Sequence, residues 1–133
     1  MIIVVATQDS PRCAALIDRL RREPGVELTV AASGRAVLDQ VRAQCPDLVL
    51  ADEQLDDMTG LALIEQVVQA NPMINTALVG ALSEDDFHEK TEGLGVLMQV
   101  PVCPTEADAE RLLRIVNNIG ILMPKPTEGD KVC

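Results

Sequence analysis

Five short apolar runs recur along the chain and limit its possible folds more than any other feature. The runs are Ile2–Ala6, Val26–Ala31, Leu48–Ala51, Thr76–Ala81 and Val96–Val100. Four of them are essentially continuous in apolar residues, as strands buried on both faces must be. The second run alternates between apolar and polar residues, which is typical of a strand at the edge of a sheet.

Helical patterns lie between the runs. Ser10, followed by Pro11, predicts the N-cap of a first helix, and Ser83 predicts that of a short fourth helix. Thr105 and Asp108 predict a capping box that opens the last helix. Apolar residues at helical spacing predict the second and third helices: Val37, Leu38, Val41 and Cys45, then Leu61, Ile64, Val67 and Val68. This alternation predicts an α/β fold, with a parallel sheet and helices on both faces.

The length of 133 residues corresponds to one domain, and nearly half of the residues are apolar, which excludes disorder over most of the chain. No internal repeat or domain boundary is present. We expect a single domain over 1–120 and a polar tail, punctuated by prolines, over 121–133.

The net charge of −10 argues against a nucleic-acid partner, because no basic stripe offsets phosphate repulsion. The N-terminal sequence MIIVVATQDS has no basic leader, and its apolar run is too short to span a membrane. We therefore expect a cytoplasmic protein with no membrane partner.

Ligands of an open parallel sheet bind at the carboxyl ends of its strands. The residues that follow the runs are therefore the candidates for chemistry. They are Thr7, Gln8 and Asp9 after the first, Asp52, Glu53 and Gln54 after the third, Gly80, Ala81 and Leu82 after the fourth, and Val100 and Pro101 after the fifth.

The segment Pro46–Ile64, PDLVLADEQLDDMTGLALI, resembles the receiver domain of bacterial two-component response regulators. The matching positions are Pro46, Asp47, Asp52, Met58 and Gly60. The resemblance covers about residues 1–119. It implies a flavodoxin-like (CheY-like) five-stranded parallel sheet in the order 2-1-3-4-5. Helices one and five would cover one face of that sheet, and helices two, three and four the other.

The resemblance also implies a site. Asp52 would be the phosphoacceptor for a histidine kinase, and Mg²⁺ would be held by Asp9, Asp52 and the backbone carbonyl of Gln54. The acidic pair that binds the metal in this family maps to Thr7-Gln8 or to Gln8-Asp9, and the sequence leaves this register open. Since at most one carboxylate of the pair remains, we expect weak Mg²⁺ binding.

Three switch positions depart from the family pattern. Gly80 lacks the hydroxyl expected after strand four, Val100 lacks the charge of the usual lysine, and Leu97 replaces an aromatic residue. Phosphoryl transfer depends on cationic groups that offset charge on the phosphoryl oxygens. The sequence therefore predicts a degenerate pocket, and it offers no catalytic residue.

Three functions follow. The first is a stand-alone receiver in a phosphorelay, regulated at Asp52, and the second is a pseudo-receiver that docks proteins without phosphate control. The third, an enzyme or nucleotide-binding domain, is the weakest, because no glycine-rich loop follows the first strand. Expected partners are a histidine kinase or another signalling protein. A second copy of the chain is a further candidate, paired through the fourth helix, fifth strand and fifth helix, where Phe87 is the single aromatic residue of the chain.

Overall fold

The computed structural model describes residues 1–122 as strands alternating with helices. The strands are β1 (Ile2–Ala6), β2 (Glu27–Ala31), β3 (Leu48–Asp52), β4 (Asn75–Val79) and β5 (Val96–Val100). The helices are α1 (Ala14–Arg22), α2 (Gly34–Gln44), α3 (Gly60–Ala70), α4 (Glu84–Thr91) and α5 (Glu106–Leu122). The tail expected over 121–133 lies, beyond Leu122, outside the described residues.

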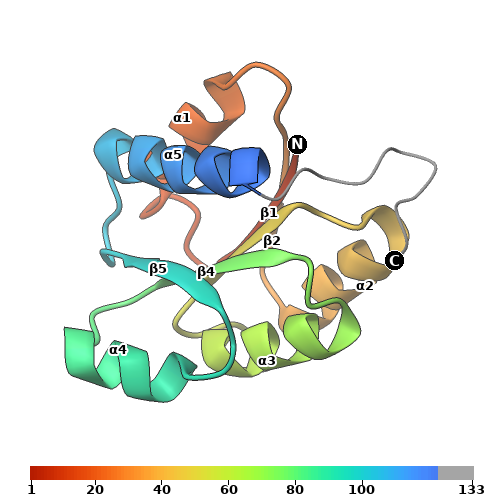
Figure 1. Ribbon diagram of the computed structural model, residues 1–133, viewed down its shortest axis with the longest axis vertical. Coiled ribbons are helices and arrows are strands. Elements are labelled where there is room, and N and C mark those ends of the chain that lie inside the picture. The colour runs from red at the N-terminus through yellow and green to blue at the C-terminus, as the bar shows by residue number, and fades with distance from the viewer. Residues whose placement is uncertain (123–133) are drawn as a thin grey trace.

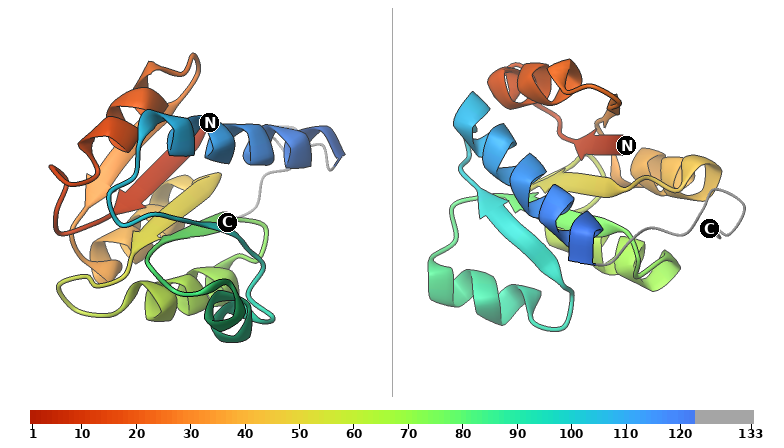
Figure 2. Two further views of the ribbon diagram at one scale, coloured as in Figure 1. Left: turned by 90° about the vertical axis from the view of Figure 1, so that its left-hand side faces the viewer. Right: turned by 45° about the horizontal axis from the view of Figure 1, so that its top comes forward.

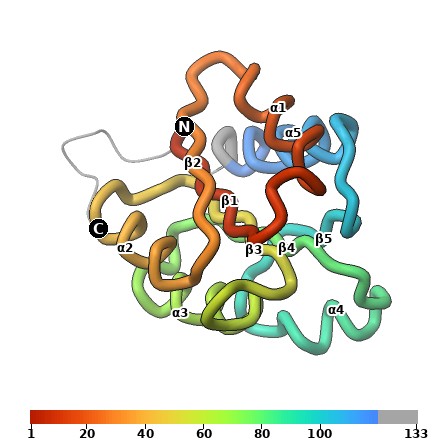
Figure 3. Tube along the Cα trace, turned by 180° about the vertical axis from the view of Figure 1, so that it is seen from behind, coloured from red at the N-terminus to blue at the C-terminus, as the bar shows by residue number. Residues whose placement is uncertain are grey.

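The strands form one parallel sheet in the order β2-β1-β3-β4-β5, which runs from side to side in Figure 3. The predicted order is therefore confirmed. All five residues of β3 are buried, whereas the edge strand β2 has no fully buried residue. The carboxyl ends of β1 and β3 lie side by side, since Ala6 pairs with Ala51. This places the loops after the two strands at one edge of the sheet.

Helices cover both faces of the sheet, with α1 and α5 on one face and α2, α3 and α4 on the other (Figures 1 and 2). Each face encloses an aliphatic core. Leu16, Leu20 and Leu112 pack on Ile3 and Leu50 beneath α1 and α5. The second core, beneath α2, α3 and α4, is built from these side chains: Val4, Val37, Val49, Leu63, Ile64 and Val67. The predicted assignment of helices to faces is confirmed.

Local capping signals account for most helix starts. The Ser83 hydroxyl accepts a hydrogen bond from the Asp86 amide at 3.1 Å, as the sequence predicts. Thr105 and Asp108 form the predicted capping box, in which the Asp108 carboxylate accepts from the Thr105 amide at 2.8 Å.

The predicted start of the first helix is wrong. The N-cap of α1 is Cys13 and not Ser10, and residues 10–13 form a turn. The turn arises because the Asp9 carboxylate accepts from the Arg12 amide at 3.3 Å, while the Cys13 amide donates to the Ser10 carbonyl at 3.1 Å. Arg12 therefore lies in the loop after β1 and not on a helix.

A register shift interrupts the pairing of β4 with β5. Thr76 pairs with Val96, but Leu78 pairs with Gln99, so β5 contains one residue more than β4 in this interval. Such a bulge redirects the side chains that follow it. No helix within residues 1–122 is long and apolar enough to cross a membrane.

Candidate functional site

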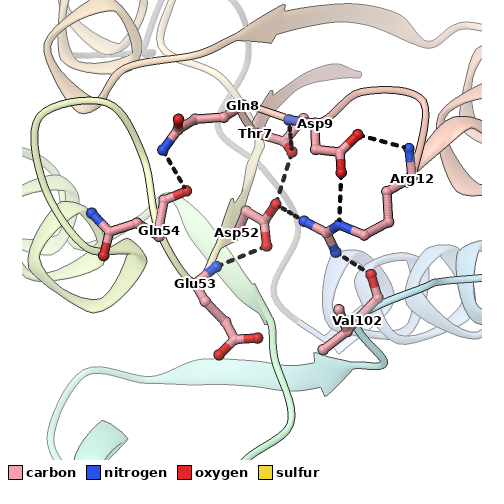
Figure 4. Close-up of polar contacts among 8 residues, drawn as sticks. All are labelled: Thr7, Gln8, Asp9, Arg12, Asp52, Glu53, Gln54 and Val102. Carbon is pink, nitrogen blue, oxygen red and sulfur yellow. Dashed lines mark hydrogen bonds and ion pairs between the residues drawn. The ribbon is translucent and has the colours of Figure 1, made fainter.

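Asp52 is the last residue of β3, and its carboxylate lies under the loop after β1. The residue is only 4% exposed. One oxygen, Oδ1, accepts from the Glu53 amide at 2.9 Å, and the other, Oδ2, accepts from the Thr7 hydroxyl at 2.8 Å. The side chain of Glu53 points away from this carboxylate (Figure 4). A buried carboxylate also requires a counter-charge, because two neutral donors do not offset the loss of hydration.

Arg12 supplies that counter-charge. Its guanidinium forms an ion pair with Asp52 Oδ2 and also donates to the carbonyl of Val102, in the loop after β5 (Figure 4). Arg12 Nε lies 3.5 Å from a carboxylate oxygen of Asp9. One cation therefore joins the loop after β1 to the last residue of β3 and to the loop after β5.

These contacts favour the charged guanidinium. Burial opposes the charge of Arg12, but the Asp52 carboxylate, with a smaller contribution from Asp9, outweighs it and raises the pKa of Arg12 above its ordinary value. The short turn of residues 10–13 makes the arrangement possible, because it leaves Arg12 beside the sheet edge before α1 begins. The site therefore carries its own cation.

The three expected metal ligands are engaged by other groups. Asp52 and Asp9 both form ion pairs with Arg12. The backbone carbonyl of Gln54 accepts from the side-chain amide of Gln8 at 3.3 Å. Within residues 1–122, no group of three His, Cys, Asp or Glu residues could hold a metal ion. Arg12 already offsets the charge of both carboxylates, so the residues as they lie favour this cation over Mg²⁺.

The first two residues after β1 contact Asp52 or the loop that follows it. Thr7, which is 3% exposed, contacts the carboxylate directly, and Gln8 reaches Gln54. The Asp9 carboxylate faces Arg12 instead of Asp52. The backbone amide of Asp9 donates to the Thr7 hydroxyl at 3.0 Å. Thr7-Gln8 is thus the pair that lies against Asp52 and its loop.

The family-like segment Pro46–Ile64 has clear structural roles. The Asp47 carboxylate accepts from the Ile2 amide at 2.8 Å, which fixes the start of β1 beside β3. A Cβ atom on Gly60 would lie 2.0 Å from the Asp52 carbonyl oxygen, so only glycine allows α3 to begin so close to the strand. These two motif positions support the backbone on which Asp52 sits.

The loop after β3 is tied to α2. The Asp57 carboxylate accepts from the amides of Gly34 and Arg35 at 2.7 and 3.1 Å. The Gly34 hydrogen bond, together with that from Arg35, lowers the pKa of Asp57 below its ordinary value, although desolvation opposes the shift. Asp57 therefore caps the helix from another loop.

The three switch positions lie in different surroundings. Val100 is 0% exposed and belongs to the core beneath α1 and α5, and Leu97 is partly buried against the same core. Gly80 lies beside Gln99 and Glu53, where an added Cβ would lie 2.8 Å from Gln99 Oε1. Of the three switch positions, Gly80 lies beside polar side chains at the carboxyl ends of the strands, whereas Val100 and Leu97 face the aliphatic core.

Gln99 is a second polar residue of this edge that sequence reasoning overlooked. Its side-chain amide accepts from the Leu82 amide at 3.0 Å and donates to the Leu82 carbonyl at 2.9 Å. Two sequence features could have drawn attention to these residues. Gln99 is the one polar residue in the apolar strand β5, and Arg12 is a cation close to the end of β1. Neither signal indicates its partner, since Arg12 and Asp52 are 40 positions apart.

Comparison with known proteins identifies the family of this chain. Residues 2–101 match the family model of the response regulator receiver domain. The chain is 36% identical over 81 residues to the transcriptional regulatory protein ZraR of Escherichia coli K12, which covers 61% of this chain and 18% of that protein. It is 29% identical over 93 residues to the probable transcriptional regulatory protein TcrX of Mycobacterium tuberculosis, covering 70% and 39%. The chain thus spans less than half the length of these relatives.

Solved structures share the fold. A CheY-like response regulator receiver domain protein from Methanospirillum hungatei JF-1 superposes with a TM-score of 0.75 at 21% identity, over 88% of this chain and 94% of that chain. A putative response regulator from Chloroflexus aurantiacus gives 0.72 at 19% identity, over 87% and 97%. With the family model spanning all five strands, the chain belongs to the response regulator receiver domain family.

Proposed function

We propose that this domain is a pseudo-receiver, a docking module of two-component signalling in which Asp52 stabilises the fold instead of accepting phosphate. The family itself is a signalling module and not an enzyme, and it implies a partner kinase or another signalling protein. The observation that carries the proposal is the ion pair between Arg12 and Asp52. A carboxylate with a fixed internal cation has less need of a metal and less nucleophilic character.

The chemistry of phosphoryl transfer supports this choice. A carboxylate that attacks a phosphoryl group needs an accessible oxygen, together with cations placed on the phosphoryl oxygens. Asp52 Oδ2 is shared between Arg12 and Thr7, and the residue is 4% exposed. Arg12 is directed at the carboxylate and at the Val102 carbonyl, so it neutralises the attacking group instead of an incoming phosphate.

Partner binding is the remaining activity of such a domain. A groove of about 560 Å³ lies between α4 and β5, and Phe87, Thr91, Val96 and Leu97 are among its lining residues. The first turn of α4 contains Glu84, Asp85 and Asp86, so a positively charged partner surface is favoured there. We propose this face, together with α5, for a cytoplasmic signalling partner that carries a positively charged surface.

The test is phosphorylation of the full chain by acetyl phosphate with Mg²⁺, followed by intact-mass spectrometry. We expect no phosphoryl adduct on the wild-type chain beyond that on Asp52→Asn, because Arg12 occupies the carboxylate. An adduct that is lost in Asp52→Asn would instead establish a phosphorelay receiver regulated at Asp52.

A double variant tests the part of the proposal that concerns the metal. Thr7→Asp with Arg12→Ala places a second carboxylate beside Asp52 and removes the internal cation. Two adjacent carboxylates repel each other and favour a divalent cation. We expect Mg²⁺ to raise the melting temperature of this double variant more than an equal ionic strength of NaCl does.

A further inference from the structure

Gln99 clamps the loop between β4 and α4. Its side-chain amide makes two hydrogen bonds to one residue, accepting from the Leu82 amide and donating to the Leu82 carbonyl, at 3.0 and 2.9 Å. A primary amide has both a donor and an acceptor, so it can pair with the N–H and the C=O of one residue. The Gln99 side chain does so by reaching from β5 to the neighbouring loop. The register shift before Gln99 turns its side chain toward the face that carries α3 and α4.

Gly80 makes room for the clamp. A Cβ atom at this position would lie 2.8 Å from Gln99 Oε1, the same oxygen that accepts from Leu82. It would also lie 3.3 Å from Glu53 Cγ. The absence of a side chain at residue 80 and the presence of an amide at residue 99 are therefore two parts of one arrangement.

The clamp acts on a helix that has little packing of its own. Thr91 is the only buried residue of α4, at 8% exposed, and Phe87 is partly buried on the core beneath α3. Leu82 immediately precedes Ser83, the N-cap of α4. Holding the Leu82 backbone therefore sets the point at which α4 leaves the sheet.

We propose that the Gln99–Leu82 clamp holds the start of α4 in one position without any group bound at the sheet edge. This inference deepens the proposed function, since it concerns how the helix next to the same site is fixed without phosphate. A receiver that switches needs two loop positions with different contacts. Here the neutral side chain of Gln99 fixes one position of the loop between β4 and α4.

Residue-resolved hydrogen exchange of the full chain tests the clamp. In Gln99→Leu, an apolar side chain of similar size replaces the amide, so both hydrogen bonds to Leu82 are lost. The Leu82 amide and the amides of α4 are then expected to exchange about tenfold faster or more, because each hydrogen bond contributes roughly a factor of ten. Amides of β1 and β3 are expected to keep their rates. Met98→Leu on the same strand is the matched control, and it should leave Leu82 unchanged.

A second variant approaches the clamp from the other side. Gly80→Ala leaves Gln99 intact but places a methyl group against its oxygen, so it should accelerate the same amides. Unchanged exchange at Leu82 and in α4 in both variants would overturn the proposal, as would equal acceleration across all five strands. Exchange does not depend on phosphate, so these outcomes are separate from the acetyl phosphate result.

Discussion

At the scale of single residues, the site is organised by one charge pair. Asp52 is the residue that the sequence motif predicts as the phosphoacceptor, and its carboxylate is held by Arg12, whose side chain is 21% exposed. Removing either partner has unequal consequences, because Arg12 can turn toward water while Asp52 remains buried.

Arg12→Ala is expected to lower the free energy of unfolding by about 2–3 kcal/mol. This is less than the roughly 3–5 kcal/mol of a fully buried pair, since the Thr7 and Glu53 donors remain. Asp52→Ala should cost less, and the double variant should cost less than the sum of the two. Urea unfolding measures all three variants.

Arg42→Ala is the control for the comparison of the Arg12→Ala and Asp52→Ala variants. Its pair with Asp39 is exposed, with side chains 75% and 67% accessible, so the expected change is below about 0.5 kcal/mol. Strict additivity of Arg12→Ala and Asp52→Ala would contradict an energetic link between the two side chains.

Val100→Lys is expected to destabilise the fold and not to restore a phosphate-binding group. Val100 is fully buried among aliphatic side chains, so the ammonium loses its hydration and the lysine pKa falls below about 10.4. The folded state then binds fewer protons than the unfolded state, and stability should rise as the pH increases toward that value. Chemical unfolding at neutral and at alkaline pH measures this slope, and a flat profile would place the lysine in solvent.

At the scale of helices and strands, loops hold neighbouring elements in place. Asp57 illustrates this, because it lies after β3 but caps α2 through Gly34 and Arg35. Its effect on stability depends on its charge, since the helix N-terminus favours an anion.

Asp57→Asn should reduce stability at neutral pH and have little effect in acid. The pKa of Asp57 is below its ordinary value of 3.8, so its contribution is complete above that value and is lost as the pH falls through the lowered pKa. Thermal unfolding of both proteins across acidic pH gives the difference. Asp56→Asn, in the same loop, controls for the loss of one charge. A stability difference between the wild-type chain and Asp57→Asn that grew as the pH fell would contradict the capping role of Asp57.

Phe87 links α4 to the sheet. Its ring packs on the core beneath α3 and also lines the groove between α4 and β5. Phe87→Ala should therefore cost about 1–3 kcal/mol, below the roughly 3–5 kcal/mol of a fully buried phenylalanine. Urea unfolding gives this value, and sedimentation at several concentrations reports whether self-association falls as well. A negligible stability loss would mean that the ring contributes only to an interface.

The sequence predicted local features well and non-local ones poorly. Ser83 and Thr105 correctly predicted helix starts, because each capping bond joins residues only three positions apart. The prediction from Ser10 was wrong because another local bond competes with the cap: the Asp9 carboxylate accepts from the amide of Arg12 and forms a turn. The pairing of Arg12 with Asp52 and the clamp by Gln99 depend on strand order and on a bulge. Neither can be inferred from neighbouring residues.

At the scale of the whole molecule, two aliphatic cores enclose a sheet and leave a strongly acidic surface. The net charge of −10 creates self-repulsion that any salt reduces. A response to Mg²⁺ is therefore informative only beside a monovalent salt of equal ionic strength.

MgCl₂ and NaCl at matched ionic strength are expected to raise the melting temperature of the wild-type chain by the same amount. The reason is that the expected metal ligands are engaged by Arg12 and Gln8. Differential scanning calorimetry measures both shifts. An additional rise with MgCl₂ that disappears in Asp52→Asn would reveal a specific metal site.

The reach of Arg12 also bears on the order in which the chain acquires its native contacts. Arg12 and Asp52 are 40 positions apart, whereas Arg12 and Val102 are 90 apart. During synthesis, the ion pair can form once β3 has emerged, but the bond to Val102 must wait for the last crossover. The pair with Asp52 can therefore form before the bond that joins Arg12 to the C-terminal half. Local opening of the later strands would release the Val102 bond and leave Asp52 neutralised.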